Sequence, residues 1–225
     1  MSFAGAAVSL AATAISVAFA ALVLHQWLDR RKPFQLAWSL GLGLYAVAAF
    51  TQFLAEAYGW SEGIYRIYYV VAAPLVAVLG TGSVLLVNRR YGYAFAAYTA
   101  ILFVAFAWVI AGAPVLQAAF SEPIPGGDGF SESVRIWSPL FTVPGSLALI
   151  GVAAYSYWRT RLLFNAWIAI GALVVAAGGA LTRFGIAWAL YLSELIGIAL
   201  MFWGFLASGE PSKIRRSAPQ ELLAR

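Results

Sequence analysis

The chain has 225 residues and a net charge of +5; 63% of its residues are hydrophobic and only 10% are charged. Soluble domains carry about a quarter charged residues, so this composition excludes an ordinary soluble domain. The lack of cysteine excludes disulfides and thiolate metal sites, and the single histidine, His25, excludes histidine-based zinc sites and bis-histidine haem ligation. We therefore expect an all-α, polytopic membrane protein without metal or haem, whose basic residues report orientation and not nucleic-acid binding.

Seven apolar segments are long enough to cross a hydrocarbon core about 30 Å thick. They lie at approximately 3–27, 34–58, 63–87, 92–113, 134–157, 162–183 and 186–208. No Lys or Arg precedes the first segment, and it is longer than the apolar region of a signal peptide, so we expect it to be retained as a span. The predicted organisation is a seven-helix transmembrane domain over residues 1–208 and a basic, flexible cytoplasmic tail over residues 209–225.

Basic residues gather in alternate connections between these segments. These connections hold 11 of the 14 Lys and Arg residues, namely Arg30, Arg31, Lys32, Arg89, Arg90, Arg159, Arg161, Lys213, Arg215, Arg216 and Arg225. The positive-inside rule then places the amino terminus outside and the carboxyl terminus in the cytoplasm. We expect a multi-pass protein of the plasma membrane or of a prokaryotic inner membrane.

The one long connection, residues 115–133, is acidic and rich in Pro and Gly, which predicts an extracytoplasmic loop. It is interpreted either as a lid over a vestibule or as an ordinary tether between two spans.

Two stretches of the sequence echo one another, "WLDRRKPFQLAWSLGLG" (27–43) and "WRTRLLFNAWIAIGA" (158–172). Each has a Trp, a basic turn, a Phe, a polar residue and an Ala-Trp pair, and each starts a span of the same direction. This suggests a parallel repeat of three helices, one linker helix and three helices, a plan found in transporters. The alternative is that Trp and basic turns recur at the membrane interfaces of any multispan protein.

Four segments carry a stripe of polar and small residues at helical spacing. The stripes are Tyr45, Ala49, Gln52 and Glu56; Arg66, Tyr69, Ala73, Ala77 and Gly80; Arg135, Ser138, Thr142 and Gly145; and Ala187, Tyr191, Glu194, Gly197, Met201 and Gly204. Polar residues in lipid must find partners inside the bundle, so we expect all four stripes to face one another.

Glu194 is the deepest carboxylate, about 12 Å inside its helix, and it is costly to bury without a partner. We expect it to pair with an arginine, and three Arg against two Glu leave one positive charge for a small anionic or zwitterionic ligand. The predicted ligand-binding residues are Glu56, Arg66, Tyr69, Arg135, Arg183, Tyr191 and Glu194. The alternative is that most of these charges lie near helix ends, reach water and form structural ion pairs.

No Walker, Rossmann or nucleophile-elbow motif is present, so we do not expect an enzyme. The seven-span plan with the amino terminus outside resembles that of microbial rhodopsins, which hold retinal on a lysine of the last span. Residues 186–208 contain no lysine, so we expect no covalently bound retinal.

Two function classes remain. The first is a transporter of a small anionic or zwitterionic solute. The second is a receptor, sensor or assembly subunit with structural ion pairs. The expected partners are the lipid bilayer, the ligand, and either further copies of the chain or another membrane protein.

Overall fold

The computed structural model describes residues 3–121, 125–182, 186 and 188–208, with the backbone alone for residues 180 and 182, and these residues contain helices and no strand. The long helices are α1 (Phe3–Arg30), α2 (Pro33–Tyr58), α3 (Glu62–Val87), α4 (Arg89–Gly112), α6 (Trp137–Thr160), α7 (Leu163–Thr182) and α8 (Trp188–Ala207). The short helices η1 (Gln117–Ser121) and α5 (Glu132–Arg135) lie in the connection between α4 and α6. The predicted all-helical class is confirmed.

Local signals set the helix boundaries. Pro33 begins α2, where its missing N–H is not needed. Gly59, with φ 89°, ends that helix, and the Ser61 side chain caps α3 by accepting from the Ile64 N–H at 3.3 Å. Asn88 ends α3 and also caps α4 by accepting from the Tyr91 N–H at 3.2 Å. One residue thus separates two long helices.

Six helical segments are long and apolar enough to cross a membrane: α1, α2, α3, α4, the stretch from α5 through α6, and α8. Helix α7 contains a shorter apolar helical segment, Leu163–Gly179. Large apolar side chains such as Ile101 and Trp108 on α4 are mostly exposed, as expected for a surface that faces lipid. These features suggest a multi-pass membrane protein.

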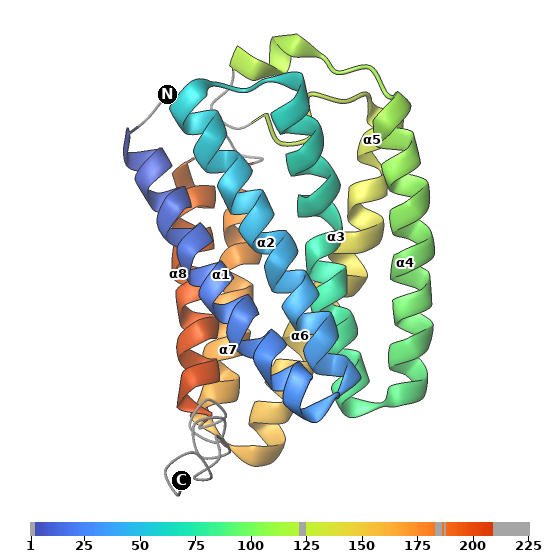
Figure 1. Ribbon diagram of the computed structural model, residues 1–225, viewed down its shortest axis with the longest axis vertical. Helices are drawn as coiled ribbons and strands as arrows, with labels where there is room; N and C mark the ends of the chain where they lie inside the picture. The colour runs from blue at the N-terminus through green and yellow to red at the C-terminus, as the bar shows by residue number, and fades with distance from the viewer. Residues whose placement is uncertain (1–2, 122–124, 183–185, 187, 209–225) are drawn as a thin grey trace, which may run out of the picture.

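The helices form a ring with one helix outside it. Helix α1 packs on α2, α2 on α3, α3 on α6, α6 on α7, α7 on α8, and α8 returns to α1. Helix α4 packs on α3 at the edge of the molecule (Figure 1). Helices α3 and α6 approach so closely that a Cβ at Gly145 would lie 2.6 Å from the Ala77 nitrogen. Because α3 packs on α2 and α6 within the ring and on α4 outside it, α3 connects α4 to the ring.

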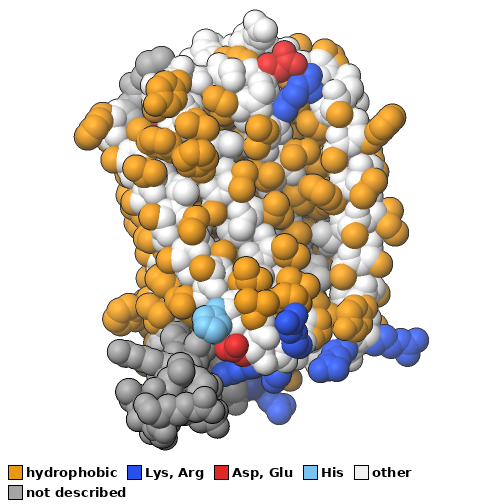
Figure 2. Space-filling model, viewed as in Figure 1, with side chains coloured by type: hydrophobic (Ala, Val, Ile, Leu, Met, Phe, Trp, Pro, Cys, Tyr) orange, Lys and Arg blue, Asp and Glu red, His pale blue; other side chains and the backbone are white. Residues whose placement is uncertain are grey.

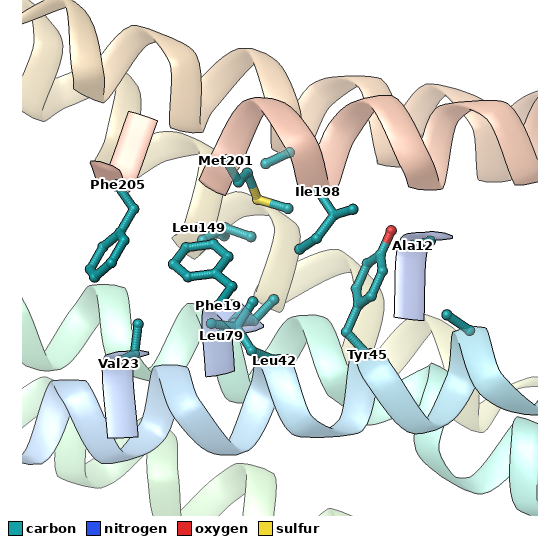
Figure 3. Packing of buried hydrophobic residues seen from close by; sticks show 12 residues of the cluster. Ala12, Phe19, Val23, Leu42, Tyr45, Leu79, Leu149, Ile198, Met201 and Phe205 are labelled. Carbon is teal, nitrogen blue, oxygen red and sulfur yellow. The ribbon is translucent and has the colours of Figure 1, made fainter. Parts of the chain in front are cut away.

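Two large clusters of buried apolar residues fill the bundle, beside a small third cluster of Ala48, Tyr68 and Val71. The ring core consists of Ala12, Phe19, Val23, Leu42, Tyr45, Ala49, Leu79, Leu149, Ala172, Ile198, Met201 and Phe205 (Figure 3). The α4-side core consists of Tyr65, Tyr69, Ala73, Ala77, Phe106, Ile110, Ala113, Phe130, Val134 and Phe141. Helix α3 contributes to both, so its opposite faces are buried against different neighbours.

Lys and Arg side chains gather at one end of the molecule (Figure 2). This is the end where α1 finishes at Arg30, α4 begins at Arg89 and α6 finishes at Thr160. We call it the basic end. The orientation of the chain in the membrane remains a prediction, and so do the role of the tail and the internal repeat.

Candidate polar site between helices α2, α3 and α8

Glu194 occupies the centre of the buried face of α8. Tyr191, Gly197, Ile198 and Met201 lie three, four or seven residues away on the same face, and all four are buried. Glu194 itself is only partly buried. The helix thus turns this carboxylate toward the interior of the bundle.

Glu194 is tied to α2 by two hydrogen bonds. The Gln52 side-chain amide donates to its carboxylate Oε1 at 3.1 Å. The Tyr45 hydroxyl donates to its backbone oxygen at 2.9 Å. Gln52 has no exposed surface, so its contact with Glu194 is made inside the protein. No arginine among the described residues forms an ion pair with Glu194.

Gln52 also reaches α3. Its Nε2 lies 3.4 Å from the hydroxyl oxygen of Tyr68, a buried residue. Its other side-chain atom, Oε1, is buried and has no hydrogen-bond partner among the described residues. The amide therefore uses its donor group and leaves an acceptor unused in the middle of the site.

A second polar contact lies one helical turn away. The Tyr191 hydroxyl donates to Oε1 of Glu56, a buried residue on α2. On the other side of this carboxylate, a Cβ at Gly5 of α1 would lie 3.0 Å from the Glu56 Cδ. The glycine therefore lets α1 pack against the carboxylate. We call Tyr45, Gln52, Glu56, Tyr68, Tyr191 and Glu194 the α2–α8 polar cluster.

Arg66 lies in different surroundings. Its Nη2 is 2.7 Å from Oε1 of Glu62, one turn earlier on α3. The same guanidinium donates to the backbone oxygens of Ile110 and Ala113, the latter at 2.8 Å. Both carbonyls lie at the end of α4, where a helix offers no N–H donor of its own. A positive charge there also interacts favourably with the helix dipole. Arg66 thus fastens α4 to α3.

Arg135 and Tyr69 also lie on the α4 side of α3. Arg135 Nη1 is 2.8 Å from Oδ1 of Asp128 in the preceding loop, and both side chains are largely exposed. The Tyr69 ring packs against Phe130 and Phe106, with centroids 5.1 and 5.8 Å away. These residues belong to the α4-side core and its rim.

The expectation that all four stripes face one another is therefore wrong in part. The stripes of α2 and α8 lie opposite each other, but Tyr69, Ala73 and Ala77 of α3 face α4 and α6. Neither Arg66 nor Arg135 pairs with Glu194, because each has an acidic partner close to it in the sequence. Sequence reasoning missed Glu62 as a partner, although its spacing of four residues from Arg66 indicates such a pair.

Arg183 and Ala187 lie outside the described residues. Of the seven residues predicted to bind a ligand, the structure brings together Glu56, Tyr191 and Glu194 and places Arg66, Tyr69 and Arg135 elsewhere. Ligand binding by any of them remains a prediction.

The long connection packs onto the α4-side core. The Tyr65 hydroxyl donates to the Gly126 oxygen at 2.9 Å and accepts from the Gly129 N–H at 3.1 Å. Phe130 is buried beneath the loop, with 2% of its surface exposed. The described part of the loop is thus fixed over α3 and α4 by its own backbone.

In chemical terms, the α2–α8 polar cluster combines two carboxyl groups, three phenol hydroxyls and one amide. Carboxylates and aromatic rings both attract a positively charged group when water is excluded.

No family model, curated protein or solved structure matches the chain.

Proposed function

We propose that the chain is a transporter, and not an enzyme, for a small zwitterionic or cationic solute whose positively charged group binds at the α2–α8 polar cluster. The observation that carries this proposal is the position of Glu194. It sits at the centre of the buried face of α8, keeps some exposed surface, and bonds to Gln52 on the facing helix. Glu194 is therefore not fully enclosed by its neighbours.

The charges around Glu194 favour a positively charged ligand group. Arg66 and Arg135 are already paired with Glu62 and Asp128, so they do not supply the surplus positive charge that the sequence suggested. A carboxylate within a membrane bundle is costly without compensation and marks a solute or proton pathway. An ammonium group or a proton at Glu194 provides that compensation. Arg183 lies outside the described residues, and its contact with the anionic end of a zwitterion remains a prediction from the sequence.

The arrangement of the helices supports transport as the use of this site. The six ring helices divide into α1–α2–α3 and α6–α7–α8, each packed in sequence, with α4 outside the ring. A repeat of three helices, a linker helix and three helices requires two helix triplets that each pack in sequence and a helix between them in the chain. Transporters built from repeats bind their solute at the interface between them, and the α2–α8 polar cluster joins one triplet to the other.

Ligand binding tests the proposal first. The purified protein in nanodiscs is titrated with a panel of amino acids and of primary and quaternary amines, and binding is followed calorimetrically. Glu194→Gln keeps a hydrogen-bonding partner for Gln52 but removes the charge. We expect it to weaken binding roughly 30-fold or more, because breaking a buried charge pair costs about 2–5 kcal/mol.

Glu62→Gln is the matched control, because it neutralises a carboxylate at the rim of the same bundle that is paired with Arg66. It should leave the affinity unchanged. Binding that prefers anions, or that is equally strong in Glu194→Gln, would contradict the proposed site. Uptake of the bound compound into proteoliposomes then tests transport, and binding without uptake would favour the receptor or sensor class instead.

A further inference from the structure

A second buried polar pair lies between α1 and α2, close to the basic end. Gln35 Nε2 donates to Gln26 Oε1 at 3.3 Å, and the two residues are only 2% and 3% exposed. The remaining side-chain atoms, Gln26 Nε2 and Gln35 Oε1, are buried without a partner among the described residues. Exchanging N and O in both amides reverses the bond but again leaves one nitrogen and one oxygen unused. The pair thus offers one donor and one acceptor.

This pair lies on the same buried helix faces as the α2–α8 polar cluster. On α1 a single face carries the buried residues Gly5, Ser9, Ala12, Ser16, Phe19, Val23 and Gln26. On α2, Gln35 precedes Gln52 by 17 residues, which corresponds to about 26 Å along the helix. The two polar positions therefore lie near opposite ends of one packed seam.

Apolar side chains of the ring core fill the seam between them. Phe19 packs against Phe202 and Phe205 of α8, with ring centroids 5.2 and 5.0 Å apart. Ile198 is fully buried and Met201 is 6% exposed. Figure 3 shows Tyr45 and Ile198 toward one side of this packing and Phe205 toward the other.

We propose that the Gln26–Gln35 pair is a second binding position of the same pathway, at the basic end of the bundle. It suits a neutral group that both donates and accepts hydrogen bonds, such as water or the hydroxyl or amide of a solute. Phe19, Ile198 and Met201 form the closed barrier between this position and Glu194. This inference rests on the proposed function, because it supplies the path that a solute bound at Glu194 would follow.

A proton-leak measurement tests the barrier without knowledge of the solute. Proteoliposomes containing a trapped pH dye are given a potassium diffusion potential with valinomycin. Phe19→Ala combined with Met201→Ala should hydrate the seam and raise proton influx several-fold over the unmodified protein. Adding Gln26→Leu and Gln35→Leu should reduce that influx, because the polar position at the basic end is lost.

Phe106→Ala combined with Phe141→Ala is the matched control. Both side chains are fully buried, but they belong to the α4-side core. This control should not raise proton influx. If the barrier variant does not fold, Met201→Gln takes its place, because it introduces a polar group of similar volume. No rise with the folded barrier variant, or an equal rise with the control, overturns the inference.

The outcomes separate this inference from the proposed function. A leak in the barrier variant, with solute binding unaffected by Glu194→Gln, supports the pathway and overturns the solute site. Loss of solute binding in Glu194→Gln, with no leak in the barrier variant, overturns the pathway and leaves the proposed function standing.

Discussion

The side-chain amide of Gln52 on α2 lies 3.1 Å from the carboxylate of Glu194 on α8, although the two residues are 142 positions apart in the chain. This hydrogen bond exists only when α2 and α8, the second and the last helices of the ring, are assembled. It therefore connects the stability of the bundle to the site that we propose for the solute.

A double-mutant cycle measures this connection. Gln52→Leu leaves the Glu194 carboxyl group without its amide donor, which should lower the free energy of unfolding by about 1–3 kcal/mol. Combining Gln52→Leu with Glu194→Leu should show a coupling energy of about 0.6 kcal/mol, the average for interhelical polar contacts in membranes, and at most about 1.7 kcal/mol. Unfolding in mixed micelles by added SDS provides the measurement. A coupling energy of zero would mean that the contact contributes nothing to the bundle.

Arg66 should matter far more to stability than its acidic partner does. Arg66→Leu removes the donors that satisfy the Ile110 and Ala113 carbonyls, and hydrogen bonds to a charged group contribute about 1.5–3 kcal/mol. Glu62→Ala removes only a partly exposed ion pair, which typically contributes about 0–1 kcal/mol. Hydrogen exchange at the end of α4 should accelerate in Arg66→Leu and stay nearly constant in Glu62→Ala. The opposite order would show that the ion pair, and not the carbonyl capping, fastens α4.

Two glycines on α6 should respond to alanine in opposite directions. A Cβ at Gly145 would meet the α3 backbone at 2.6–2.7 Å, whereas a Cβ at Gly151 meets nothing within 4 Å. Gly145→Ala must push α3 and α6 apart, which should destabilise the protein by about 1–3 kcal/mol. Gly151→Ala should stabilise it by up to about 1 kcal/mol through helix propensity. Thermal unfolding of the two variants in one detergent makes the comparison, and equal effects would contradict the close crossing.

Because the chain contains no cysteine, single-cysteine variants can test the orientation directly. Ser133 is an exposed residue of the short helix α5, and Leu162, which is 47% exposed, lies at the basic end between α6 and α7. We expect Ser133→Cys to react with a membrane-impermeant maleimide on intact cells. Leu162→Cys should react only after the membrane is opened. The reverse labelling would place the amino terminus in the cytoplasm.

The sequence predicted the helices well because their signals are local. The segment predicted at 63–87 corresponds to α3 at Glu62–Val87, where apolar length and the flanking turn residues act together. Residue periodicity also identified Gln52, Glu56, Tyr191 and Glu194 as members of interior faces. It could not tell which neighbour each face meets, because α3 packs on α2, α4 and α6 at once.

The partners of the arginines show the same limit. The spacing between Glu62 and Arg66 was a usable signal, because residues four apart meet on a helix surface. The capping of α4 by Arg66 was not predictable, since it depends on how two helices cross. The Gln26–Gln35 contact likewise depends on how α1 and α2 pack after the turn at Arg31 and Lys32.

Arg66 finds its acidic partner on its own helix, so the charge on α3 is compensated without any contribution from α4. Residues four apart meet on a helix surface, so Glu62 is within reach of that guanidinium as soon as α3 is helical. The final carbonyls of α4 then meet N–H donors that the ion pair with Glu62 helps to hold in place. The ion pair of Arg66 thus needs only α3, whereas its bonds to the α4 carbonyls need both helices in place.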